Sequence, residues 1–154
     1  MEKIVNKLIE KNKTISTMES CTGGALASEI TNIEGSSSVL KYSAITYSNE
    51  FKIKMGVSSK IIDEFSVYSM QTANEMSLNI SKFTNSDYGV GITGKLNRTD
   101  ENNNFGEDNV VFISIYDKAN NKYYNKEFKV TEKNRKTNKK TVIKEVKNLL
   151  LEII

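Results

Sequence analysis

The feature that most constrains this fold is a turn of small residues between a strand pattern and a helix pattern. Residues 14–18 alternate like a short β-strand, and the turn Glu19-Ser20-Cys21-Thr22-Gly23-Gly24 follows directly. Leu26, Ala27, Ile30 and Ile33 then recur on one face of a helix. A strand, a tight turn and a helix in this order indicate a sheet that is covered by helices.

The rest of the chain continues this alternation and then changes to a hairpin. We expect helices over 2–12, from 48 to about 56, and over 69–83, with a last helix that carries Val142, Val146, Leu149, Leu150 and Ile153. Strands are expected over 39–47, 88–93, 110–116 and 123–130, and a mobile polar loop over 97–109. This order predicts a three-layer α/β/α sandwich with a mixed sheet, folded as a single domain over 1–154.

Composition limits the chemistry that is available to such a domain. The chain has no histidine and one cysteine, Cys21. Histidine is the usual general base near neutral pH and the commonest metal ligand, and a single cysteine allows neither an internal disulfide nor a cysteine-rich metal site. We therefore expect no metal and no cofactor, and any hydrolytic reaction must use another base.

Charge and hydropathy patterns favour a soluble, cytoplasmic protein. No apolar run approaches the roughly 18 residues that cross a bilayer, and the start of the chain is amphipathic where a signal peptide would be continuously apolar. The net charge of +3 gives little support for nucleic-acid binding. We expect no membrane contact.

The first turn has the composition of an anion-binding helix start. Backbone N–H groups after Ser20, with Gly23 and Gly24 allowing close approach, could hold a phosphate or a carboxylate. A capped helix start with tight backbone packing explains the same residues. Cys21 lacks a histidine partner and is better explained as a small packed residue than as a nucleophile.

A second small-residue segment, Gly35-Ser36-Ser37-Ser38, is followed by Tyr47 and Lys52. A serine needs a proton acceptor to become a nucleophile, and a desolvated lysine can replace histidine in that role. Burial lowers a lysine's pKa because it disfavours the charged form. The alternative is a solvated helix lysine beside a flexible serine loop.

Two more segments complete the candidates. Gly91-Ile92-Thr93-Gly94 runs from a strand into a turn and could offer a hydroxyl and N–H groups to an oxyanion, or could simply be a strand end. A lysine-rich run around Arg135 has the pattern of a solvated helix face, although an arginine at its start could reach a ligand phosphate.

Several blocks occur in one order over nearly the whole chain. They are Met18-Glu19-Ser20-Cys21-Thr22-Gly23-Gly24, Gly35-Ser36-Ser37, Thr46-Tyr47-Ser48-Asn49-Glu50 with Lys52, Gly56-Val57, Val67-Tyr68-Ser69, Glu75-Met76 and Gly91-Ile92-Thr93-Gly94. Together they resemble the CinA C-terminal domain, which is the nicotinamide-nucleotide amidase family.

This resemblance implies hydrolysis of nicotinamide mononucleotide to nicotinic acid mononucleotide and ammonia, without a metal or cofactor, by a homodimer. By position, Ser37 matches the family's nucleophile, Lys52 its general base and Tyr47 a hydroxyl that assists them. The residues expected to contact substrate are Ser20, Thr22, Gly23, Gly24, Thr93, Gly94 and Arg135.

The chain departs from the family after Thr93-Gly94. The usual glycine-rich continuation is replaced by Lys95-Leu96-Asn97-Arg98 and an asparagine-rich stretch. Because this loop would touch the substrate, a second hypothesis stays open. Under it, the chain is a catalytically impaired nucleotide-binding module, or a competence-related protein-interaction module.

Overall fold

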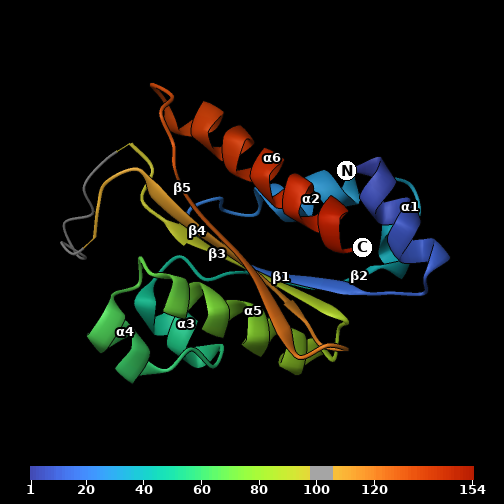
Figure 1. The fold of residues 1–154 in the computed structure, drawn as a ribbon, viewed down its shortest axis with the longest axis horizontal. Helices are drawn as coiled ribbons and strands as arrows, with labels where there is room; N and C mark the ends of the chain where they lie inside the picture. The colour runs from blue at the N-terminus through green and yellow to red at the C-terminus, as the bar shows by residue number, and fades with distance from the viewer. Residues whose placement is uncertain (98–105) are drawn as a thin grey trace.

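The computed structural model describes residues 1–97 and 106–154 (Figure 1). The helices are α1 (Glu2–Glu10), α2 (Ala25–Thr31), α3 (Asn49–Lys54), α4 (Ser59–Phe65), α5 (Met70–Thr84) and α6 (Arg135–Ile153), with a short 3-10 helix over Ser36–Ser38. The strands are β1 (Ile15–Glu19), β2 (Leu40–Ile45), β3 (Tyr88–Gly94), β4 (Val110–Asp117) and β5 (Lys122–Lys129).

The strands form one mixed sheet in the order β2-β1-β3-β4-β5. β1 pairs in parallel with β2 and with β3, whereas β3–β4 and β4–β5 are antiparallel. Every residue of β1, β3 and β4 is buried, as expected for central strands that are covered on both faces. The carboxyl ends of β1, β2 and β3 therefore lie at the same edge of the sheet.

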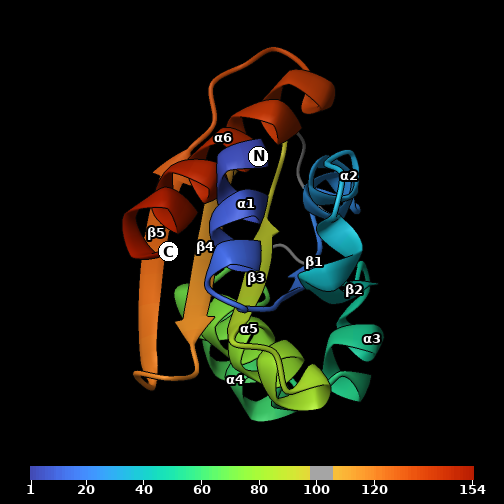
Figure 2. The same cartoon turned by 90° about the vertical axis from the view of Figure 1, so that its right-hand side faces the viewer.

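Helices cover both faces of the sheet, which confirms the predicted three-layer sandwich. α1, α2 and α6 lie on one face and α3, α4 and α5 on the other (Figures 1 and 2). The larger apolar core joins the first group of helices to the sheet, and a smaller one around Met18, Met76 and Ile80 joins α5 to the other face. Across the part of the chain that is described, no helix is both long and apolar enough to cross a membrane.

Two glycines let α5 pack unusually close to β3. A Cβ atom at Gly89 would lie 2.0 Å from the Ser77 carbonyl oxygen, and one at Gly91 would lie 2.3 Å from the Ala73 carbonyl oxygen. Only a residue without a side chain fits at such distances. These glycines thus explain the close contact of the helix and sheet backbones beneath the carboxyl edge.

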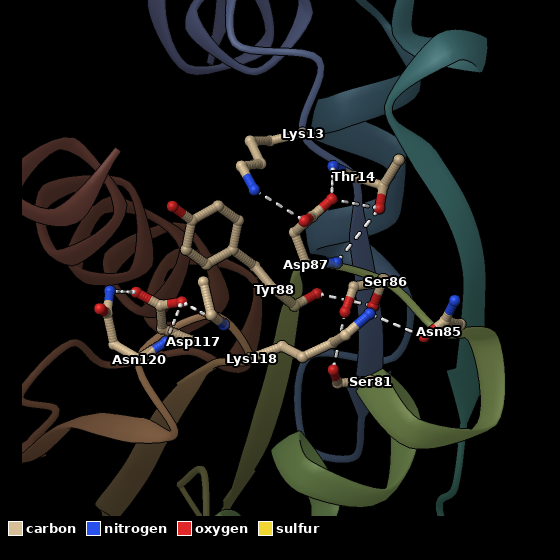
Figure 3. Close-up of polar contacts among 11 residues, drawn as sticks. Lys13, Thr14, Ser81, Asn85, Ser86, Asp87, Tyr88, Asp117, Lys118 and Asn120 are labelled. Atoms are coloured by element: carbon tan, nitrogen blue, oxygen red, sulfur yellow. Dashed lines mark hydrogen bonds and ion pairs between the residues drawn. The ribbon is translucent and has the colours of Figure 1, made fainter.

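The opposite edge, at the amino ends of β1 and β3, is held by polar contacts (Figure 3). Asp87 accepts hydrogen bonds from the Thr14 N–H at 2.8 Å, the Thr14 hydroxyl at 2.9 Å and the Lys13 ammonium at 3.0 Å. Burial alone would raise the pKa of the Asp87 carboxyl, but these hydrogen bonds and the charge of Lys13 lower it overall. This cluster fixes the start of β1 against the start of β3.

The sequence patterns predicted most elements to within about two residues, with two omissions: α4 and the short 3-10 helix over Ser36–Ser38. Helix α4 was not expected, and the structure explains why: none of its residues is buried, so its sequence carries little helical periodicity. α6 also begins earlier than its apolar positions indicated, at Arg135. Most of the predicted loop over 97–109 falls on residues 98–105, outside the described residues.

Candidate active site

The turn after β1 is shaped by a buried carboxylate. Glu19 is fully buried and accepts hydrogen bonds from the Thr22 hydroxyl at 2.7 Å and from the N–H groups of Ala27 at 2.9 Å, Gly24 at 3.1 Å and Leu26 at 3.1 Å. Glu19 thus caps α2 from within the protein. This contact fits the capped helix start, which the sequence left open as the alternative to anion binding, because these N–H groups already have an acceptor in Glu19.

Ser20 follows Glu19 directly and is paired with Lys52. The Lys52 ammonium donates to the Ser20 hydroxyl oxygen at 3.1 Å and to the Thr46 carbonyl oxygen at 2.8 Å. The Lys52 side chain is almost completely buried, with 2% of the residue exposed, and Ser20 is 6% exposed. A hydroxyl and a buried amine thus lie within hydrogen-bonding distance in a chain that has no histidine.

Short local structure positions this amine. α3 begins after Ser48, whose hydroxyl accepts a hydrogen bond from the Phe51 N–H at 3.3 Å. The helix places Lys52 on its inward face, below the carboxyl end of β2. Ser20 is held from the other side, because its N–H donates to the Ile92 carbonyl oxygen of β3 at 3.0 Å.

The predicted pairing of Ser37 with Lys52 is wrong. Ser37 lies in the 3-10 helix that precedes β2, and it is exposed. The Lys52 amine binds the carbonyl of Thr46, which follows β2. The strand between them rises by about 3.3 Å per residue, which separates the two positions by about 20 Å. The serine hydroxyl that Lys52 contacts is that of Ser20.

Tyr47 and Arg135, which are 88 residues apart, come together at the same edge of the sheet. The Arg135 guanidinium donates to the Tyr47 hydroxyl oxygen at 3.1 Å and to the Leu96 carbonyl oxygen. Tyr47 is 63% exposed. The arginine therefore joins the segments that follow β2 and β3 to the first turn of α6, beside the Ser20 turn.

Thr93 and Gly94 lie at the end of β3, next to Ser20 in the sheet. The Thr93 side chain is fully buried, and its hydroxyl donates to the Val67 carbonyl oxygen at 2.7 Å. That bond anchors the segment before α5 to the sheet. To donate to an oxyanion, as predicted, this hydroxyl would have to leave the Val67 carbonyl oxygen. Its observed hydrogen bond is structural.

Positive charge surrounds the turn. Burial raises the pKa of the Cys21 thiol to about 12, and it outweighs the charges of Arg135 and Lys52, which act to lower it. The thiol is thus a packed, protonated group, as the sequence indicated. Lys139 adds a third cation: its amine lies 3.2 Å from the place where a Cβ atom on Gly23 would sit.

Over the described ranges, no group of three or more His, Cys, Asp and Glu side chains could hold a metal ion.

This geometry can be compared with known proteins. The family model for the CinA C-terminal domain matches residues 1–154. The chain belongs to the CinA C-terminal domain family. A CinA-like protein of Flavobacterium psychrophilum is 41% identical over 119 residues, which are 75% of this chain and 28% of that protein. One from Kosmotoga olearia is 46% identical over 94 residues, 60% of this chain and 23% of that protein.

The chain thus spans less than a third of the length of these curated CinA relatives. Solved structures of the CinA superfamily share the fold. The Escherichia coli superfamily protein superposes with a TM-score of 0.91 at 22% identity, over 99% of this chain and 87% of that one. The competence/damage inducible protein CihA of Agrobacterium tumefaciens gives 0.86 at 24% identity, over 98% and 93%.

Sequence reasoning missed three residues that shape this site. Glu19 holds the turn, the Thr46 carbonyl holds Lys52, and Lys139 lies against Gly23. Glu19 and Thr46 stand inside the quoted family blocks, so their positions at the end of β1 and directly after β2 were an available signal. No sequence pattern distinguished Lys139 from the lysines around it.

Proposed function

We propose that this domain is a metal-independent amidase that hydrolyses the carboxamide of nicotinamide mononucleotide, with Ser20 as the nucleophile and Lys52 as the general base. The observation that carries the proposal is the 3.1 Å contact between a buried lysine amine and a serine hydroxyl. The substrate in this proposal is taken from the resemblance to the nicotinamide-nucleotide amidase family.

The proposed reaction uses these two side chains in both halves. The neutral Lys52 amine accepts the Ser20 proton while the serine oxygen attacks the amide carbon. The resulting ammonium returns that proton to the amide nitrogen, and ammonia leaves as the C–N bond breaks. Water then attacks the ester, Lys52 takes a proton from it, and the acid departs as Ser20 recovers its hydrogen.

Burial supports this role for Lys52. Only 2% of Lys52 is exposed, and its amine contacts the Ser20 hydroxyl and the Thr46 carbonyl inside the protein. The Gly24 N–H is bound by Glu19 and the Gly23 N–H by the Ser20 carbonyl. The N–H groups of Cys21 and Thr22 are therefore the candidates for holding the negative oxygen of the intermediate. Tyr47 and Arg135 are proposed to contact the substrate at the mouth of the site.

Ammonia release from nicotinamide mononucleotide tests the proposal. Ser20→Ala and Lys52→Met should each lower the rate by about a thousandfold or more, because each removes one half of a cooperating pair. Ser37→Ala is the matched control and should keep the wild-type rate. Circular dichroism and thermal unfolding check that each variant remains folded. Loss of activity in Ser37→Ala with full activity in Ser20→Ala would reverse the assignment.

A non-catalytic nucleotide-binding module remains the second candidate, because the segment after β3 departs from the family pattern. Lys95 in this segment is 3% exposed, and its ammonium donates to the Gly106 carbonyl oxygen at 3.2 Å. Saturable nucleotide binding with no ammonia release at high protein concentration would favour this candidate.

We also propose that the domain pairs with a second copy through the β2 edge. β2 is an edge strand, and large apolar side chains beside it are exposed: Tyr42, Ile45, Phe51 and Phe83. Such a patch next to an open strand favours association. Sedimentation should give a dimer for the wild type and a monomer for Ile45→Lys; a monomeric wild type would exclude the dimer.

A further inference from the structure

A groove of about 480 Å³ runs between α2 and α6, outside the Ser20–Lys52 pair. Its volume falls within the range of small-molecule sites, roughly 300–1,000 Å³. Ala25, Ser28 and Glu29 of α2 form one wall. The other wall is the face of α6 that carries Lys136, Lys139, Lys140, Lys144 and Lys147.

The charge along this groove is compensated only at its far end. The Lys147 ammonium lies 2.8 Å from a carboxylate oxygen of Glu29, and that hydrogen bond together with the charge of Lys147 lowers the Glu29 pKa. Lys136, Lys139 and Lys140 form no ion pair with any residue in the described ranges. The near end of the groove is therefore the part suited to an anion.

That near end adjoins the turn that carries Ser20. The Lys139 amine lies over Gly23, 3.2 Å from the position of an added Cβ, and Gly23 is three residues after Ser20. One helical turn earlier, Arg135 binds the Tyr47 hydroxyl. The first turns of α6 thus connect the lysines of the groove with the proposed catalytic pair.

We infer that Lys139, with Lys136 and Lys140, binds the phosphate of a substrate whose carboxamide lies at Ser20. The inference rests on the proposed amidase function and deepens it by naming the residues that would hold the phosphate of the nucleotide. Lysine ammonium groups form charge-assisted hydrogen bonds with phosphate, and three of them match a group that carries up to two negative charges.

Steady-state kinetics of Lys139→Gln test the assignment. Loss of one charge-assisted hydrogen bond should raise the KM for nicotinamide mononucleotide roughly ten- to a hundredfold while kcat stays within about twofold. The KM for nicotinamide riboside should not change. Lys60→Gln, which removes an exposed lysine of α4, is the control for net charge. Equal effects of Lys139→Gln on both substrates, or no effect on either, would overturn the inference.

A binding measurement keeps the subsite testable if the domain releases no ammonia. Ribose 5-phosphate is titrated into wild type, Lys139→Gln and Lys60→Gln, and binding is followed by calorimetry. We expect saturable binding by wild type and Lys60→Gln, weakened at least tenfold in Lys139→Gln. Absent binding, or equal binding by all three, excludes the phosphate subsite. Absent ammonia release together with the expected binding pattern excludes the amidase but retains the subsite.

Discussion

Replacing Glu19 by glutamine should destabilise the protein through the turn that carries Ser20. The carboxylate accepts from the Thr22 hydroxyl and from the N–H groups of Gly24, Leu26 and Ala27. A glutamine amide has nearly the same shape but only one acceptor oxygen. In one orientation its NH2 group would face the Ala27 N–H, and in the other it would face the Thr22 hydroxyl and the N–H groups of Gly24 and Leu26. At least one buried donor therefore loses its acceptor.

The size of the effect follows from these contacts. An unsatisfied buried donor costs about 1–3 kcal/mol, and each hydrogen bond that changes from charge-assisted to neutral loses about 1 kcal/mol. Relief of the desolvation of a buried carboxylate offsets part of this loss. The expected decrease in the free energy of unfolding is about 3 kcal/mol, which corresponds to a Tm lower by about 10 °C in a domain of this size.

Thermal and urea unfolding of Glu19→Gln measure this decrease. Glu50→Gln is the matched control: Glu50 is an exposed carboxylate paired with Lys54, and such pairs contribute little to stability. Ammonia release should also fall in Glu19→Gln, because the backbone of Ser20 loses its support. Identical unfolding curves for the two variants would refute the reasoning that the buried carboxylate organises the turn.

Three further predictions concern other parts of the molecule. Gly91→Ala should lower the free energy of unfolding by about 1–3 kcal/mol, because the new methyl group would press on the Ala73 carbonyl; an unchanged urea midpoint would contradict this. Asp87 has a lowered pKa, so it contributes stability above the unfolded-state carboxyl pKa of about 3.9, and this is lost as pH falls through its folded pKa. Asp87→Asn should therefore lower the free energy of unfolding at neutral pH and make it depend less on pH in acid. If the free energy of unfolding falls equally steeply in acid for both proteins, Asp87 does not contribute stability through this cluster. The Cys21 thiol, with a pKa raised to about 12, should resist iodoacetamide at pH 8 until the protein unfolds; fast alkylation of native protein would be inconsistent with its burial.

The fold was largely predictable because its periodic signals are strong. α5 carries an apolar face over four turns and begins at a serine cap. The central strands are buried and contain β-branched residues. α4 was not predicted, because none of its own residues is buried and its sequence therefore carries little helical periodicity. The sheet order could not come from local patterns, since strand pairing depends on contacts between residues distant in sequence.

The candidate site was predictable in residue types but not in pairing. The absence of histidine directed attention to a lysine base, and Lys52 is the buried lysine beside a serine. Sequence position alone did not separate Ser20 from Ser37. Likewise, nothing local indicated that Arg135 would bind Tyr47 or that Lys139 would lie on Gly23, because α6 reaches the site only in the folded protein.

Sheet polarity explains why Ser20, and not Ser37, meets the lysine. β1 and β2 run in parallel, so the segments that follow them emerge at one edge, and Ser20 follows β1 just as Thr46 and α3 follow β2. Ser37 precedes β2 and so belongs to the opposite edge, with Asp87. Ligands of open α/β sheets bind at the carboxyl ends of parallel strands. A serine that follows a strand is therefore a stronger candidate nucleophile than one that precedes it, even when the latter is closer in sequence to its base.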